Sequence, residues 1–429
     1  MRLDEWSCKK LSEITIKIGS GATPKGGKKV YQQYGVPFIR SQNIYNNLFN
    51  AGGLAFIDKE KARKLMNVEI KKDDVLLNIT GDSVARCTKV PLKYVGGRVN
   101  QHVAIIRPDQ KYLLPDFLKY YLVTPFMQES MLSLARMGGT RAALTKGMIE
   151  SFKIPVPKIR EQEFISTVLS TIDDKIGINT RINQNLEAMA QAIFKHWFVD
   201  FEFPNEEGRS YKSSGGEMVE SELGLIPRRW EVSDLGSISE IQNGFAFKAS
   251  DYVADGVKVL RTLNIGENGY FTNNNLVYLP QKYRSEKYEK YILKNFDVAL
   301  VMVGASIGKI GMVLRNTEGS LQNQNMWRFR SKDGQIPQLF LYYLVKEAQK
   351  VASNWETGSA RLFYRKDSFS KIKVIFPNNN TLMLFKKVSS AIFNRVNNNV
   401  IENERLVILR DTLLPKLMSG EIRVPMEEI

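Results

Sequence analysis

The sequence predicts an α/β (α+β) chain made of two similar globular domains, each followed by a long helix. Three observations support this prediction. One set of motifs occurs twice in the same order, at an offset of about 220 residues. Each copy begins with short β-like runs separated by Gly and Pro, and each ends in a long segment with helical apolar spacing. We expect the two helices to pair as an antiparallel coiled coil with pseudo-twofold symmetry.

The duplication is visible in several motifs that keep their order in both halves. GVPFIRSQNI (35–44) aligns with GVKVLRTLNI (256–265), and DVLLNITGDSVARC (74–87) aligns with DVALVMVGASIGKI (297–310). The later matches are Asn-Gln at 100–101 and 323–324, Tyr-Tyr-Leu at 120–122 and 342–344, and GGTR (138–141) with GSAR (358–361). A shared order of this kind indicates an internal repeat.

The first part of each copy reads as a sheet-containing domain. DVLLNIT ends in a glycine turn and is typical of a strand, and Val298 to Ala305 is a short, β-branched run that predicts a buried strand. A helical stretch is expected from Pro115 to Met127. The mixture predicts an α/β or α+β domain of irregular topology.

The second part of each copy predicts a long helix, from about Glu161 to Phe198 and from about Thr381 to Met418. Apolar residues alternate at steps of three and four, the spacing of a coiled-coil seam. Two seam positions hold asparagines in both helices, namely Asn179, Asn183, Asn399 and Asn403. A seam asparagine is often a solvated position near a helix end, but this repetition favours a role in fixing the register of the pair.

These predictions divide the chain into five parts. They are a first globular domain (1–158), a helical spacer (159–200), an exposed connector (201–227), a second globular domain (228–379) and a second helical spacer (380–422).

The composition favours a polyanionic partner. Sixty-one Lys and Arg against 45 Asp and Glu give a net charge of +16, and neutralised phosphates release condensed counterions. The alternative is a basic protein that is merely soluble. With two cysteines and two histidines, a disulfide framework or a histidine metal cluster is not expected. No apolar run approaches ~18 residues and no signal peptide begins the chain, so a cytoplasmic location is expected.

Two similar domains on a rigid spacer suit DNA. A helix pair of ~30–40 residues is about 45–60 Å long, whereas half-sites one turn apart on B-DNA are separated by ~34–36 Å. Because the copies have diverged, we expect a bipartite, asymmetric target with an unread gap.

The segment FVDFEFPNEEGRSYKSSGGEMVESELGLIPRRWEV (198–232) resembles the central region of the specificity subunits of Type I restriction–modification systems. LLPKLMSGEI (413–422) resembles the end of that family, and the likeness covers essentially the whole chain. The resemblance implies that the globular parts are target-recognition domains for double-stranded DNA.

The same resemblance implies the partners. A non-catalytic subunit of this kind, present as a single copy with an internal pseudo-dimer, would recruit two modification subunits that methylate adenine. It would also recruit restriction subunits in the full complex. No cofactor is expected on this chain, since S-adenosylmethionine would bind the modification subunits and ATP and Mg the restriction subunits.

Candidate DNA-reading residues lie at predicted strand ends and loops, where Arg can read guanine and Asn or Gln can read adenine. In the first domain they are Arg40, Ser41, Gln42, Asn43, Asp82, Ser83, Arg86, Gln101, His102, Thr140 and Arg141. In the second domain they are Arg261, Thr262, Asn264, Ser306, Lys309, Gln324, Asn325, Ser359 and Arg361. Residues shared by the two copies, above all the Asn and Gln, could instead hold turns, because divergent half-sites need divergent readers. The loops KGGKK (25–29) and RSEKYEK (284–290) could equally carry the specificity.

The aromatic residues Phe194, Trp197 and Phe198 are candidates for binding the modification subunits, since exposed apolar surface is costly in water. The alternative is burial against the second helix of the chain itself.

Catalysis is not expected. The chain has no Pro-Pro and therefore no adenine-methyltransferase motif, and GASIGKI (304–310) does not fit a P-loop. Two other functions stay open: the DNA-recognition part of a single-chain methyltransferase–nuclease, and a protein scaffold without a DNA role. A first domain that begins directly at Met1 disfavours the former, and the charge disfavours the latter.

Overall fold

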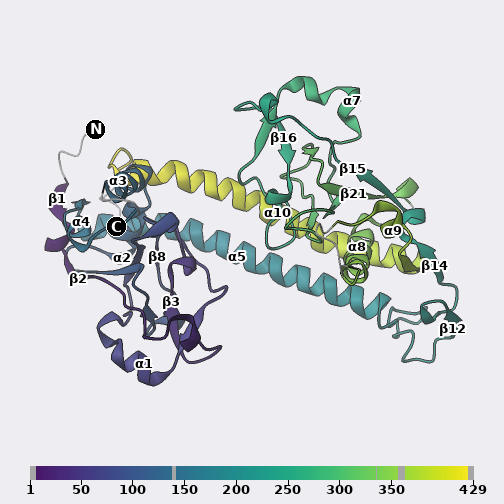
Figure 1. The fold of residues 1–429 in the computed structure, drawn as a ribbon, viewed down its shortest axis with the longest axis horizontal. Coiled ribbons are helices and arrows are strands. Elements are labelled where there is room, and N and C mark those ends of the chain that lie inside the picture. Colours follow the sequence, from purple (N-terminus) through teal and green to yellow (C-terminus); the bar gives the residue numbers. More distant parts are fainter. Residues whose placement is uncertain (1–5, 138–141, 335, 356–362, 424–429) are drawn as a thin grey trace. The chain divides into compact units, whose positions relative to one another are not determined.

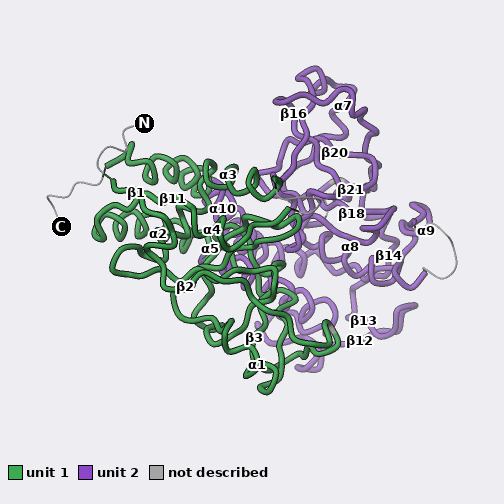
Figure 2. Tube along the Cα trace, turned by 60° about the vertical axis from the view of Figure 1, so that its left-hand side comes forward, with its two compact units in different colours: residues 1–177, 405–429 green, residues 178–404 purple. Residues whose placement is uncertain are grey.

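The computed structural model describes residues 6–137, 142–334, 336–355 and 363–423. The chain forms two compact units (Figure 2), one made of residues 1–177 and 405–429 and the other of residues 178–404. Each unit therefore contains one globular domain together with one end of both long helices. The two units are defined by spatial contacts. They do not test the five predicted parts, whose boundaries follow the order of the sequence.

The globular domain of the first unit is built on a four-stranded antiparallel sheet, in the order β2-β10-β7-β8. A three-stranded sheet, β6-β3-β9, and the pairs β1-β11 and β4-β5 complete it. The strands are β1 (Ser7–Lys10), β2 (Thr15–Ser20), β3 (Val36–Ile39), β4 (Ile44–Tyr45), β5 (Leu48–Phe49), β6 (Ala55–Ile57), β7 (Val75–Asn78), β8 (Cys87–Lys89), β9 (Arg98–Val99), β10 (Val103–Pro108) and β11 (Lys153–Val156). Its helices are α1 (Lys59–Lys64), α2 (Pro115–Leu122), α3 (Pro125–Arg136) and α4 (Lys146–Glu150).

The central strand β7 is buried on both faces. Side chains alternate between the faces of a strand, so Val75 and Leu77 pack with Phe117 of α2 in one core, whereas Leu76 and Ile105 belong to a second core beside the β6-β3-β9 sheet. Burial on both sides explains why this segment is an unbroken apolar run rather than an alternating one.

The globular domain of the second unit repeats this topology. Its sheets have the orders β15-β21-β18-β19 and β17-β16-β20, and β14 pairs with β22. The strands are β14 (Glu231–Asp234), β15 (Ser239–Asn243), β16 (Val257–Leu260), β17 (Val277–Leu279), β18 (Val298–Val301), β19 (Ile310–Met312), β20 (Leu321–Gln322), β21 (Met326–Ser331) and β22 (Lys373–Phe376). Its helices are α6 (Leu235–Ile238), α7 (Glu286–Glu289), α8 (Gln338–Ser353) and α9 (Lys366–Ser370). The predicted repeat of a mixed α and β domain is confirmed, including the buried strand at Val298.

The two long helices are α5 (Ile159–Phe198) and α10 (Asn379–Met418), as predicted to within two residues at their starts (Figure 1). In the first unit, Leu169 near the start of α5 shares a core with Leu417 near the end of α10. In the second unit, Phe194 near the end of α5 shares a core with Phe385 near the start of α10. The beginning of each helix packs with the end of the other, so the predicted antiparallel pairing is confirmed.

The seam asparagines face one another within the second unit. Asn399 Nδ2 donates to Asn183 Oδ1 at 2.7 Å, and Asn179 Nδ2 donates to Asn403 Oδ1 at 2.9 Å. Asn183, Asn399 and Asn179 are buried, so these amide hydrogen bonds form where water is excluded, although the buried Oδ1 of Asn179 accepts no hydrogen bond from the described residues. Their role in fixing the register stays a hypothesis.

The expectation that the segment 201–227 is exposed is wrong for its aromatic residues. The segment contains a hairpin of β12 (Met218–Ser221) and β13 (Gly224–Pro227). Phe201 and Phe203 are buried, and the Phe203 ring stacks on Trp230 with a centroid distance of 4.8 Å. The many Gly, Ser and Glu residues suggested an exposed segment. Phe201 and Phe203 nevertheless pack into the hydrophobic core of the second unit.

Candidate nucleic-acid interface

The structure brings together the predicted readers of the first domain that it describes. They occupy three loops: residues 40–43 after β3, residues 80–86 between β7 and β8, and residues 100–102 before β10. The side chain of Asn78 donates to Ser41 O at 2.9 Å, and the backbone N–H of Ile79 donates to His102 O at 3.0 Å. These hydrogen bonds place the loops side by side at one edge of the domain.

The second domain has an equivalent cluster. The backbone N–H of Asn323 donates to Leu260 O at 3.1 Å, and that of Met302 donates to Asn325 O at 3.3 Å. Lys309 Nζ lies 3.8 Å from Glu267 Oε1, which links the loop after β18 to the segment that follows Asn264. Loops distant in the sequence therefore meet in the same way in both domains.

The predicted readers differ in how accessible they are. Those with exposed side chains are Gln42, Asp82, Gln101, Gln324 and Asn325. Those that are partly buried are Arg40, Ser41, Ser83, Arg86, His102, Arg261, Thr262, Ser306 and Lys309. Asn43 and Asn264 are fully buried, whereas Thr140, Arg141, Ser359 and Arg361 lie outside the described residues. DNA contact by the accessible residues stays a prediction.

The buried positions of Asn43 and Asn264 favour the structural alternative for this pair. A side chain with no exposed surface cannot approach a base edge without opening the loop around it. Both amides are used within the loop, because each accepts a hydrogen bond from the backbone three residues earlier. Their burial and internal hydrogen bonds favour a role in holding the turn, and base reading by either residue stays a prediction.

In the loop between β7 and β8, the side chain of Arg86 makes a cation–π contact with Tyr45. The Arg86 guanidinium lies 4.6 Å from the centroid of the exposed Tyr45 ring, an arrangement that restricts the arginine without neutralising it. The turn needs a positive φ of 74° at Gly81, and the equivalent Gly304 has a φ of 91°. In the neighbouring loop, His102 Nδ1 and Thr80 Oγ1 lie 2.6 Å apart.

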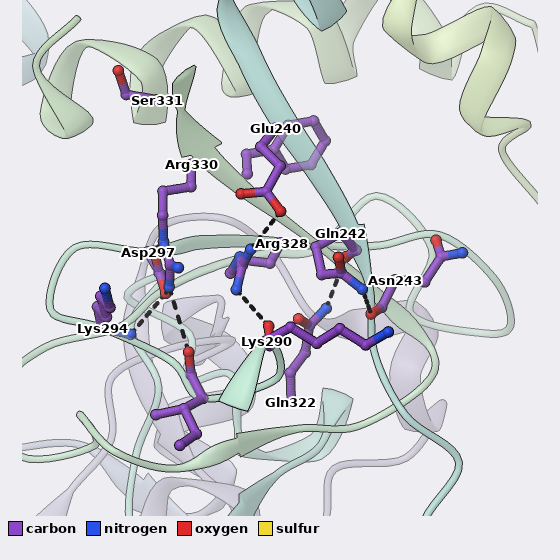
Figure 3. A network of polar contacts seen from close by, with 12 residues as sticks. Glu240, Gln242, Asn243, Lys290, Lys294, Asp297, Gln322, Arg328, Arg330 and Ser331 are labelled. Atoms are coloured by element: carbon purple, nitrogen blue, oxygen red, sulfur yellow. Dashed lines mark hydrogen bonds and ion pairs between the residues drawn. The ribbon is translucent and has the colours of Figure 1, made fainter. Parts of the chain in front are cut away.

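Two arginines on strand β21 hold the second domain together (Figure 3). Arg330 Nε donates to Asp297 Oδ1 at 2.8 Å, and the first domain has the same ion pair between Arg107 and Asp74, at 2.7 Å. Arg328 is buried between the Glu240 carboxylate, at 3.1 Å, and the Lys290 carbonyl, at 2.8 Å. Burial lowers the pKa of the Arg328 guanidinium, and the nearby positive charge of Arg330 lowers it further.

The internal role of Arg328 could not be predicted from the repeated motifs. Arg328 has an apolar counterpart, Ile105, in the first domain, so the repeat does not single it out. The ion pairs of Arg328 and Arg330 are internal, and we assign them to the packing of the domain rather than to DNA.

The aromatic residues predicted to bind a partner are largely internal. Phe194 and Phe198 are buried, with Phe194 stacked on Tyr343 at 4.8 Å and Phe198 edge-on to Phe340 at 4.7 Å. The chain's own apolar core covers these two side chains, which favours the alternative of internal burial, and a partner contact by them stays a prediction. Trp197 is partly buried beside the same core, and a partner contact there stays a prediction.

The alternative basic loops also have defined structure. In RSEKYEK (284–290), α7 places Tyr288 against Phe245, with ring centroids 5.3 Å apart, and Lys287 lies 5.3 Å from the Tyr288 centroid. Residues 27–30 form a short 3-10 turn. Either loop retains exposed cations that could contact phosphates.

Metal and membrane sites are not found in the part of the chain that the structure describes. Its His, Cys, Asp and Glu side chains form no group of three or more that could hold an ion. None of its helices has a stretch long and apolar enough to cross a bilayer.

Comparisons with known proteins agree with this architecture. The family model described as "Type I restriction modification DNA specificity domain" matches residues 3–188 and again residues 227–409. The HindI specificity subunit of Haemophilus influenzae is 26% identical over 449 residues, covering 90% of this chain and 94% of that protein. The MjaVIII specificity subunit of Methanocaldococcus jannaschii is 28% identical over 371 residues, covering 84% and 82%.

A solved structure shows the same fold. The S subunit of the Type I restriction–modification system from M. genitalium superposes with a TM-score of 0.58 at 15% identity, over 96% of each chain.

Proposed function

Because the chain belongs to the Type I restriction–modification DNA specificity family and carries two copies of its domain, we propose that each domain reads one half of a bipartite, asymmetric DNA site. The chain is thus a specificity subunit with two recognition domains. The proposal that needs a test is that the two domains read two different halves of a double-stranded DNA site.

The observation that carries this proposal is a repeated fold with different accessible side chains. Both domains have the same sheet orders and gather equivalent loops at one edge. Yet the accessible residues differ: His102 corresponds to Asn325, and Arg86 corresponds to Lys309. Base readout depends on the donors and acceptors of side chains, so one scaffold with different side chains suits two unlike half-sites.

The long helices are proposed to set the gap and to bind the modification subunits. A helix of 40 residues is about 60 Å long at 1.5 Å per residue. Apolar side chains remain exposed on both helices, including Met189 (54%) and Ile408 (68%). Such residues are candidates for a partner surface, in place of the buried Phe194 and Phe198.

The remaining expectations belong to this proposal. The chain would act in the cytoplasm without a cofactor and without catalytic activity, as a single copy with an internal pseudo-dimer. Two modification subunits would supply S-adenosylmethionine and adenine methylation, and restriction subunits would supply the ATP- and Mg-dependent steps.

Methylation mapping tests the proposal directly. The full chain is co-expressed with its modification subunit, and N6-methyladenine is mapped across a plasmid library by long-read sequencing. We expect one split motif, with two short defined parts around a gap of constant length. A continuous palindrome, or a stable complex that methylates nothing, would contradict the proposal.

A further inference from the structure

The loops Arg40–Asn43 and Arg261–Asn264 have one frame in common. In each, the buried asparagine Oδ1 accepts a hydrogen bond from the arginine backbone N–H, at 3.0 Å for Asn43 and 2.8 Å for Asn264. Each Nδ2 donates to a carbonyl of the next segment, at 2.9 Å to Asn50 O and 2.6 Å to Asn274 O. The asparagines therefore fix the shape of both loops.

The arginines belong to the same frame. Arg40 Nη2 donates to Gly53 O and Arg261 Nη2 donates to Asn275 O, both at 2.7 Å. Their backbone φ angles are −119° and −116°. Since one edge of each guanidinium is held by a backbone carbonyl, the arginines position the loop in the same way in both domains.

One exposed position within this frame carries a different residue type in each of the two domains. Ser41 and Thr262 each supply a hydroxyl and are partly buried, but the next residue is Gln42 in one domain and Leu263 in the other. Gln42 is exposed, and Leu263 is 55% exposed. A single exposed leucine is common on protein surfaces. Here, however, it occupies a loop held by internal hydrogen bonds beside the other candidate readers, and the equivalent residue in the first domain carries an amide.

We propose that position 42 in the first domain and position 263 in the second are specificity-determining positions of the two half-sites. This rests on the proposed DNA-reading function. Gln42 carries the paired donor and acceptor that match adenine in the major groove, whereas Leu263 offers only an apolar surface, which matches the methyl group of thymine.

The geometry allows each side chain to act this way. Gln42 Nε2 donates to Gly53 O at 3.2 Å, and this carbonyl also accepts the 2.7 Å hydrogen bond from Arg40. A base edge can therefore take over the amide of Gln42 while Gly53 O keeps its partner. Leu263 cannot form a hydrogen bond, so it selects by shape and by excluding water from a polar base edge.

Exchange of the two residues tests this inference. Gln42→Leu and Leu263→Gln are each introduced into the full chain, co-expressed with the modification subunit, and their methylation motifs are mapped as for the unaltered chain. Gln110→Leu and Leu225→Gln are the matched controls. Gln110 is exposed outside the loops, and Leu225 is 54% exposed on the β12–β13 hairpin.

We expect each exchange to change base preference about tenfold or more at one position of one half-site. The other half-site, the gap and both control variants should keep the original motif. Asn43→Ala, which alters the frame, should lower the melting temperature of the complex without creating a new base preference.

Other outcomes separate the possible failures. If the unaltered chain shows a split motif and both exchanges leave it unchanged in stable complexes, positions 42 and 263 do not determine specificity. If the unaltered chain shows no split motif, the proposed function itself fails. Gln42→Ala and Leu263→Ala decide the matter if an exchanged variant does not assemble, because alanine removes the reading group without adding a new one.

Discussion

At the scale of single residues, Gly21 and Gly244 allow close backbone contact with the loops that precede β10 and β21. A Cβ added at Gly21 would lie 2.2 Å from Asn100 O, and one added at Gly244 would lie 1.9 Å from Asn323 O. No side chain can occupy such a distance, so the backbones of these segments touch only because both residues are glycines. The loops that carry Gln101 and Gln324 depend on this contact.

Gly21→Ala should therefore destabilise the chain by about 3 kcal/mol, the upper range for overpacking a filled site. Gly19→Ala, two residues away on β2, is the control, because its added Cβ meets nothing within 4 Å; its effect should be within about 0.5 kcal/mol. Calorimetric melting of the full chain measures both. Equal melting temperatures for the two variants would disprove the close approach.

The two cysteines should differ sharply in reactivity. Cys87 is fully buried, and burial raises the pKa of its thiol to about 12, so the thiolate fraction at pH 8 is about 10⁻⁴. Cys8 is exposed. With iodoacetamide we expect one thiol to be alkylated in the folded chain and the second only in denaturant, with Cys8→Ser as the control. Rapid labelling of Cys87 in the native chain would show that the β8 region opens.

At the scale of elements, the antiparallel pairing of α5 and α10 combines apolar packing with buried amides. In the first unit, Arg410 Nη1 lies 2.9 Å from Asp173 Oδ1, and Tyr120 OH donates to Asp173 Oδ2 at 2.7 Å. In the second unit, the amides of Asn183 and Asn399 pair in the seam. Buried polar pairs of this kind tend to select one register at a cost in stability.

Asn399→Leu should lower stability by about 1–3 kcal/mol, because it leaves the Asn183 amide buried without its partner. The double variant Asn183→Leu, Asn399→Leu should recover that loss, since an apolar seam replaces the polar pair. Melting of the full chain and cross-linking mass spectrometry between the helices provide the measurements. The register hypothesis fails if the double variant shows the same cross-links as the unaltered chain and no additional ones.

At the scale of the whole molecule, the chain combines a duplicated topology with a large positive charge. The net charge is +16 over 429 residues, while several arginines, such as Arg107 and Arg330, are already paired with carboxylates inside the domains. The cations that remain on the loops are available to phosphates.

Binding of the assembled complex to DNA should accordingly weaken steeply with salt. With 6–10 phosphate contacts, affinity would fall by about 10³–10⁵ between 50 and 200 mM salt. Fluorescence anisotropy with a duplex that contains the mapped motif measures this dependence, and a duplex with one altered half-site is the control. A nearly flat dependence would contradict an interface based on phosphate contacts.

Local patterns in the sequence predicted much of this molecule. The repeat follows from motifs that recur in order at an offset of about 220 residues, the strand at Val298 from a short β-branched run, and both long helices from apolar steps of three and four, all of which are read along the chain. The seam asparagines were identified in the same way, and they do pair with each other. Family membership also followed from linear motifs, at 198–232 and at 413–422.

Some site residues could not be predicted in this way, because their roles depend on segments far away in the sequence. Asn43 had the right chemistry for a base and proved to be enclosed by its own loop. Leu263 had no such chemistry and became a candidate only when its exposed side chain was compared with Gln42 in the same frame. Phe194 and Phe198 suggested an exposed partner surface, and the second domain buries them.

The sequence by itself determined the duplicated architecture, the helical seam and the basic charge, since motif order, periodicity and composition are properties of the chain, and its resemblance to known linear motifs indicated the family. Only the tertiary structure decided which polar residues hold loops and which remain accessible. The physical reason is that burial and hydrogen-bond saturation depend on backbone groups brought from distant segments, such as Gly53 O beside Arg40 and Asn275 O beside Arg261.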